Sequence, residues 1–149
     1  MECMNSRIFT YGIGARKHQD KIVGGERMHD DYIIGYSVDL KEKDMVILTY
    51  NNKEKKQNRI CFSEVLTHCF ECIIEYNIIF DVQECEICNF VKDNKDKLIK
   101  MKGYCWPVAY QTEEELINFL STNEYKYIKI NSSYGMSGWV LAKSYEICK

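Results

Sequence analysis

The sequence predicts an α+β domain, mainly an antiparallel β-sheet with about two helices. Short segments with apolar residues at every second position, separated by polar turns, predict strands over most of the chain. Two other stretches carry apolar residues at helical spacing and predict helices. The chain has 149 residues, the usual length of one domain. We expect residues 28–149 to form this single domain.

Three strands are predicted in the first half of the domain. Residues 32–40 alternate between apolar and small or polar side chains, which predicts a strand with one buried face. Residues 45–50 are apolar on both faces, which is typical of a central strand. A charged loop over 51–58 then leads to a third strand that contains Ile60 and Phe62.

Residues 63–76 fit two interpretations. Their apolar residues have the spacing of an amphipathic helix, with Ser63 in the N-cap position. Every second residue from Leu66 to Ile74 also fits one face of a strand, with His68 and Phe70 among them. The pattern of residues alone leaves both interpretations open.

The second half combines two helices with further strands. We expect one helix over 87–101, ended by Gly103 just beyond it. Thr112 and Glu115 predict the start of the other, since a threonine N-cap and a glutamate three residues later satisfy free amides at a helix N-terminus. The remaining strands are expected at 77–82, 106–110, 125–130 and 139–147, and the last two should form a hairpin around a glycine-rich turn at 132–138.

Residues 1–27 differ from the rest in charge and pattern. They contain five basic and three acidic residues and show little periodicity. The codons for Gly24-Gly25-Glu26-Arg27-Met28 resemble a bacterial ribosome-binding site followed by a start codon. Our hypothesis is that the native protein begins at Met28; the alternative is a real N-terminal arm. N-terminal sequencing of the native protein distinguishes the two.

The chain carries no feature of a secreted or membrane-spanning protein. The N-terminus has no apolar signal core, and no apolar run reaches the roughly 18 residues that a membrane span needs. Eight cysteines without a signal peptide predict reduced thiols and a cytoplasmic location. The composition has no basic excess, which argues against a nucleic-acid partner.

One segment is strongly acidic. The 32 residues from Ile60 to Val91 contain no Lys or Arg, and the segment has a formal charge of −6, against −2 for the whole chain. Its carboxylates are Glu64, Glu71, Glu75, Asp81, Glu84 and Glu86. A block of one sign produces a field that attracts a basic partner. Alternatively, these residues form an ordinary solvated sheet face, with the field cancelled by lysines between 92 and 102.

Aromatic residues of the last strands are candidates for anchors on such a surface, or for sheet core. They are Tyr125, Tyr127, Tyr134, Trp139 and Tyr145.

Four of the eight cysteines have a spacing found in zinc sites. Cys69 and Cys72 form one Cys-x-x-Cys pair, and Cys85 and Cys88 form a second. Zinc bound there would stabilise a small protein-interaction module. Buried structural thiols are the interpretation we favour, because neither pair contains the Gly or Pro that a zinc-binding turn uses.

No motif predicts an enzyme or a bound cofactor. The sequence lacks a nucleophile elbow, a phosphate-binding loop and a kinase signature. Of the three histidines, His68 lies in an apolar stretch and is expected to be a core residue rather than a catalytic one.

The layout of several segments resembles a known class of proteins. They are residues 29–33, 60–65, 68–70, 77–84 and 130–140. Together they are similar to small bacterial α+β immunity proteins encoded beside polymorphic or contact-dependent toxins, over about residues 28–147. Those proteins run as a strand through the stretch that matches 63–70, which favours the strand interpretation there.

The resemblance implies a protein that binds a cognate toxin domain, often a nuclease, and blocks it. The six carboxylates named above are the residues we expect at such an interface, since an acidic face complements the basic surface of a nuclease. The cysteines are not part of the resemblance, which weakens the zinc interpretation further.

Overall fold

The computed structural model describes residues 30–148, so the predicted arm over residues 1–27 lies outside the described range. This part of the chain forms one eight-stranded antiparallel sheet and three α-helices. The predicted α+β class is therefore confirmed, with one helix more than expected. The strands are β1 (Tyr32–Asp39), β2 (Asp44–Asn51), β3 (Lys56–Ser63), β4 (Thr67–Glu71), β5 (Asn77–Cys85), β6 (Lys126–Tyr134), β7 (Ser137–Ala142) and β8 (Ser144–Cys148).

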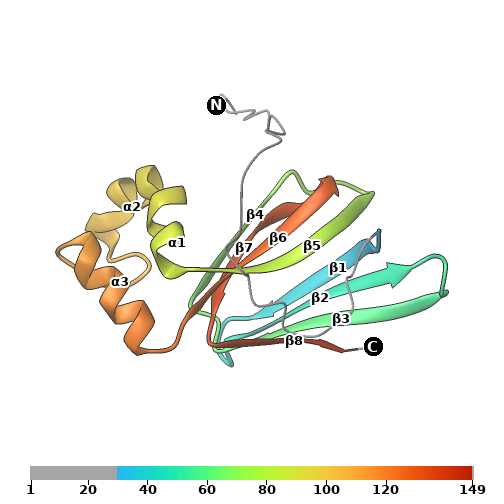
Figure 1. Cartoon of the computed structure of the whole chain (residues 1–149), viewed down its shortest axis with the longest axis horizontal. Coiled ribbons are helices and arrows are strands. Elements are labelled where there is room, and N and C mark those ends of the chain that lie inside the picture. The colour runs from blue at the N-terminus through green and yellow to red at the C-terminus, as the bar shows by residue number, and fades with distance from the viewer. Residues whose placement is uncertain (1–29, 149) are drawn as a thin grey trace, which may run out of the picture.

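The sheet folds into two layers. Its strand order is β4-β7-β6-β5-β1-β2-β3-β8, and Figure 1 shows the first four strands lying over the last four. β1 and β5 join the layers through two paired positions, Tyr32 with Ile78 and Ile33 with Asn77, and then separate. On the other side the chain bends between β3 and β4 and again at Lys143 between β7 and β8, so two segments contribute to both layers.

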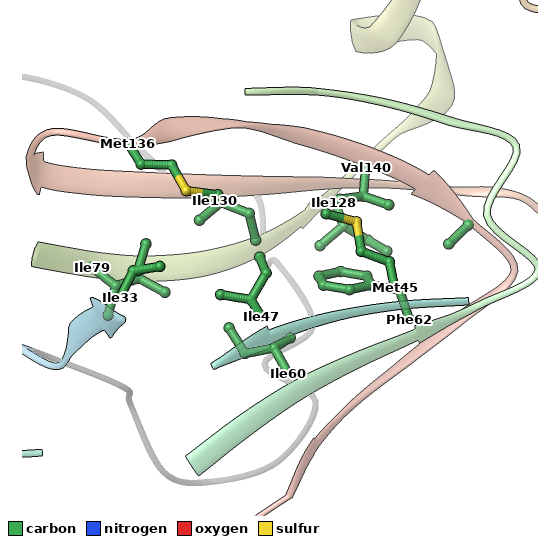
Figure 2. Close-up of a cluster of buried hydrophobic side chains, with 11 residues drawn as sticks. Ile33, Met45, Ile47, Ile60, Phe62, Ile79, Ile128, Ile130, Met136 and Val140 are labelled. Atoms are coloured by element: carbon green, nitrogen blue, oxygen red, sulfur yellow. The ribbon is translucent and has the colours of Figure 1, made fainter. Parts of the chain in front are cut away.

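The main core fills the space between the layers. Figure 2 shows its apolar side chains pointing toward one another from both sides. One layer contributes Ile47 and Phe62, and the other contributes Ile79, Ile128 and Val140, all almost fully buried. Burying one such side chain stabilises a fold by about 1.5–3 kcal/mol, so this interior is what holds the two layers together.

A second core lies on the outer face of the first layer. The helices α1 (Ile87–Asp93), α2 (Lys95–Met101) and α3 (Glu113–Thr122), with the short 3₁₀ helix η1 (Lys102–Tyr104), gather at one end of the molecule. The ring of Phe90 in α1 packs edge-on against Trp139 of β7 and Tyr127 of β6, with centroids 5.2 and 5.5 Å apart. The helices therefore cover only the part of this face near their own end.

The predicted start of the last helix is confirmed at its N-cap, and the glutamate bond is shifted by one residue. The Thr112 hydroxyl accepts a hydrogen bond from the Glu115 amide at 3.2 Å. The Glu115 carboxylate in turn accepts one from the Gln111 amide at 2.8 Å. One free amide of the first helical turn and the amide just before the N-cap are thereby satisfied.

The single helix expected over 87–101 is two helices, with a break at Asn94. The amide nitrogens of its main chain and side chain both donate to the Phe90 carbonyl, at 3.1 and 3.0 Å. Asparagine side chains compete in this way for main-chain partners and end helical turns. The apolar spacing continues through the break, so periodicity alone did not reveal it.

One predicted strand is absent and another is divided in two. Residues 106–110 form no strand, because Trp106 and Val108 pack against the helix core instead of pairing with a neighbouring strand. The strand expected over 139–147 is interrupted at Lys143, and its second half, β8, pairs with β3 rather than completing a hairpin with β6. The residues before and after Lys143 are both rich in apolar side chains, so the sequence pattern gives no sign of the bend between them.

The other boundaries shift by a few residues. β3 begins at Lys56, inside the expected loop, and the turn expected over 132–138 is shorter because β6 extends to Tyr134. Within 63–76 the strand interpretation is confirmed for β4, with His68 on the side of the main core. No helix within residues 30–148 combines the length and apolar character that crossing a membrane requires.

Candidate functional site

The six predicted interface carboxylates are spread along the path of the acidic segment. Glu64 lies in the bend between β3 and β4, and Glu71 ends β4. Glu75 follows in the β4–β5 loop. Asp81 and Glu84 lie on β5 and Glu86 immediately precedes α1, so the set does not form one compact cluster.

Strand register brings two of these carboxylates onto one row. Asp81 pairs with Asn131 of β6. The residue before Asn131, Ile130, pairs with Gly138 of β7, and Gly138 pairs in turn with Phe70 of β4. Asp81 and Glu71 therefore lie at about the same level on strands three spacings apart, or about 14 Å. The neighbours Val82 and Phe70 pack toward the main core, so both carboxylates face the outer surface, beyond the area that the helices cover.

The remaining carboxylates point elsewhere. Glu84 is opposite Ile128, a residue of the main core, and lies on the inner side at the helix end of β5. Glu86 occupies the N-cap position of α1, where its side chain makes no capping bond. Glu64 is exposed at the bend with a positive φ of 54°. The candidate site thus reduces to Glu71, Glu75 and Asp81, which we call the outer acidic group.

The described carboxylates of the segment form few ion pairs. Within residues 30–148, Glu84 alone among the six carboxylates has a basic partner, Lys126 at 3.4 Å. Of the lysines between 92 and 102, Lys97 lies against the segment, with its ammonium on the sulfur of Cys69 rather than on a carboxylate, while Lys102 donates to the Gln111 carbonyl. Asp81 accepts instead from the neutral amide of Asn131 at 2.6 Å, and no described residue forms an ion pair with it.

The loop that carries Glu75 is held in place by one side chain. The Asn77 amide oxygen accepts from the main-chain nitrogens of Ile74 and Met136, at 3.1 and 2.8 Å. The Asn77 amide nitrogen donates to the Ile74 carbonyl at 2.6 Å. Asn77 is buried, so it fastens the β4–β5 loop to the β6–β7 turn from inside.

Of the five aromatic candidates, Tyr134 is exposed on this side of the molecule. Tyr127 and Trp139 are buried in the helix core. Tyr125 packs on the helix core and Tyr145 on the main core. Ile34 of β1, which the alternation over 32–40 placed on the buried face, is exposed, and so is Phe80 of β5. In a strand, such residues have the same pattern as core residues, so the sequence held no sign of their exposure.

The four cysteines of the two Cys-x-x-Cys pairs lie in different surroundings, and none of them is buried, so the prediction of buried thiols is wrong. Cys69 lies on β4 with its sulfur 3.0 Å from the Lys97 ammonium, and Cys72 is exposed after the strand with a positive φ of 56°. Cys85 packs on the helix core, while Cys88 in α1 contacts the Glu86 carboxylate at 3.7 Å. In the part of the chain that the structure describes, no three His, Cys, Asp or Glu side chains are arranged to hold a metal ion.

A cavity of about 270 Å³ opens between the β1–β2 turn and β4. Its lining includes Val38, Leu40 and Val65, with Lys43 and His68 as the basic groups. His68 is half-buried beside the ring of Phe70, with centroids 5.8 Å apart. Burial lowers the pKa of His68 below its ordinary value of 6.5, because the charged imidazolium loses hydration there.

His68 should therefore make stability depend on pH. Between the lowered pKa of the folded state and 6.5, the unfolded chain binds more protons than the folded chain, so the free energy of unfolding rises with pH. This contribution is fully present above 6.5 and is lost as the pH falls through that window. We expect His68→Gln to flatten this part of the profile in urea unfolding across a pH series. An unchanged slope in the variant would contradict the assignment.

Comparison with known proteins adds no relative. No protein-family model matches the sequence, and no curated protein and no solved structure matches it significantly.

Proposed function

We propose that this chain is an immunity protein that binds and neutralises a cognate bacterial toxin domain, through an acidic surface, in the cytoplasm. The observation that carries the proposal is the charge of residues 60–91: six carboxylates, no Lys or Arg, and one ion pair among the described residues. The resemblance of residues 28–147 to immunity proteins of polymorphic and contact-dependent toxin systems supports the same function.

The chemistry of the site favours a nuclease toxin. A nuclease presents a basic groove to its nucleic-acid substrate. The outer acidic group can occupy such a groove with fixed carboxylates and exclude the phosphate backbone. Complementary charge also accelerates the encounter of two proteins, which an inhibitor needs if it is to act before the toxin does.

Co-expression tests the function directly. The C-terminal domain encoded by the gene immediately upstream is induced in a sensitive host, alone, with residues 1–149, and with residues 28–149. We expect the domain to be toxic alone and harmless when this protein is present. Toxicity that persists in the presence of both forms would remove the proposal.

The outer acidic group should set the association rate. Glu71→Gln combined with Asp81→Asn is expected to lower the association rate with the toxin domain about tenfold at low salt, with a smaller effect at high salt, because steering is screened by ions. Stopped-flow or surface-plasmon measurements at several ionic strengths provide the test. The matched control is Glu114→Gln, an exposed carboxylate in α3 outside the segment, which should leave the rate unchanged.

A further inference from the structure

Two irregularities of the sheet expose apolar side chains next to the outer acidic group. The pairing of β1 with β2 skips Ile34, and the pairing of β5 with β6 skips Phe80. Each strand has its irregularity close to the place where β1 and β5 separate. A β-bulge re-aims the side chain of its extra residue. Ile34 is 55% exposed and Phe80 is 45% exposed.

A row of further apolar residues connects the two bulges. Ile78 pairs with Tyr32 of β1 on one side and with Tyr134 of β6 on the other. Its neighbour Ile79 is fully buried in the main core, so Ile78 and its partners face outward. Tyr134 is 59% exposed at the end of this row.

The β4–β5 loop extends the apolar surface beyond the strands. Tyr76, which directly precedes β5, is 62% exposed, and Ile73 and Ile74 are also exposed. A side-chain carbon of Ile74 lies 3.0 Å from the position that a Cβ on Gly135 would take, so the loop touches the β6–β7 turn. Figure 1 shows the β4–β5 loop and the β6–β7 turn at the end of the first layer away from the helices.

We call these six side chains the junction patch. They are Ile34, Ile73, Ile74, Tyr76, Phe80 and Tyr134. Contiguous exposed apolar patches of several hundred Å² on soluble proteins mark interaction sites, and aromatic residues are the commonest anchors in them.

The negative charge beside the junction patch favours one class of binding partner. The outer acidic group lies beside it, since Glu75 is within the same loop and Asp81 follows Phe80. A second copy would bring like charges together across the interface, and an anionic membrane would be repelled. A protein surface with apolar side chains ringed by Lys and Arg fits both the patch and its rim.

We infer that the junction patch is the centre of the interface with the toxin domain, and that this domain presents protruding apolar side chains within a basic rim. The inference rests on the proposed function and adds a division of roles to it. The carboxylates set the association rate of the partner, and the patch sets its dissociation rate. The loop is fixed from inside by Asn77, so little conformational entropy is lost when the patch is covered.

The test uses the full chain and the toxin domain from the co-expression experiment. Tyr134→Ala, Phe80→Ala and Tyr76→Ala are each expected to raise Kd at least about tenfold, through faster dissociation, as is typical of anchor residues. The association rate should stay near that of the wild type. The matched control is Ile99→Ala, because Ile99 is 67% exposed on α2 at the helix end, and its Kd should be unchanged.

The outcomes separate the two proposals. If the wild-type chain fails to bind the toxin domain, both fall. If the wild type binds and neutralises but all three patch variants dissociate at the wild-type rate, the inference is overturned and the immunity function stands. Analytical ultracentrifugation of the chain alone tests whether the patch binds a second copy. If the wild type is a dimer and Tyr134→Ala is a monomer, the patch belongs to that dimer and the inference is overturned. Thermal unfolding of each variant confirms that it is folded.

Discussion

Replacing Gly138 with alanine is expected to lower the free energy of unfolding by about 3 kcal/mol. Gly138 lies in β7, where an added Cβ would collide with the carbonyl oxygen of Cys69 and lie 2.9 Å from the Cys69 carbonyl carbon and from the Cα of Phe70. These are main-chain atoms of β4, so they cannot move aside as the end of a flexible side chain would. Relief of the collision therefore requires the main chain to move, within β7 or between β7 and β4.

The matched control for this substitution is Gly35→Ala in β1, where an added Cβ meets no atom within 4 Å. This variant should be as stable as the wild type or slightly more so, because alanine restricts the unfolded chain. Urea unfolding of both variants gives the comparison. Equal stability of the two would refute the close approach of β4 to β7.

Asp31→Ala is expected to destabilise the protein by about 3–4 kcal/mol. Asp31 is 1% exposed, and its carboxylate accepts from Thr49 at 3.2 Å, from Asn51 at 2.7 Å and from Asn58 at 3.1 Å. These donors come from β2 and β3, so one side chain ties the start of β1 to both. Its removal leaves three donors without an acceptor, two of them on buried residues, and an unpaired buried donor costs more than its hydrogen bond contributes.

Two further variants sharpen the measurement. Asp31→Asn keeps the shape but turns one acceptor into a donor, so a smaller loss is expected from it than from alanine. Asp44→Ala removes an exposed carboxylate at the start of β2 and should change the midpoint of thermal unfolding very little. A loss for Asp31→Ala no larger than that for Asp44→Ala would contradict the role of the buried carboxylate.

The elements that sequence predicted best are those with a local cause. The N-cap at Thr112 acts over a few residues and is present as predicted. The predicted alternation in β1 is broken by a bulge, which leaves Ile33 buried and Ile34 exposed. The break at Asn94 also has a local cause, the bond from its side chain to the Phe90 carbonyl, but the apolar spacing continues across it and conceals it. The bend at Lys143 depends instead on the tertiary pairing of β8 with β3. Trp106 and Tyr110 resemble strand residues in sequence, yet they pack on the helix core.

The candidate site was predicted in its charge but not in its shape. The absence of Lys and Arg between Ile60 and Val91 is visible in the sequence, while the row that joins Glu71 and Asp81 depends on the register of four strands. The junction patch escaped prediction for a related reason. A bulge adds one residue to a strand and changes which side chains face outward, so Phe80 carries the sequence pattern of a core residue although it is exposed.

The bends between β3 and β4 and between β7 and β8 also bear on how fast the chain folds. The layers are complete only when Ser63 pairs with Ser144 and Thr67 pairs with Leu141, residues far apart in the sequence. The hairpins β1–β2 and β2–β3 close only short loops. The pairing of β3 with β8 and of β4 with β7 closes a long loop, and the entropy lost in closing it precedes any stabilising contact. We therefore expect the pairing of β3–β4 with β7–β8 to form late, and the protein to fold at the slow rates typical of β topologies rather than at those of helical proteins.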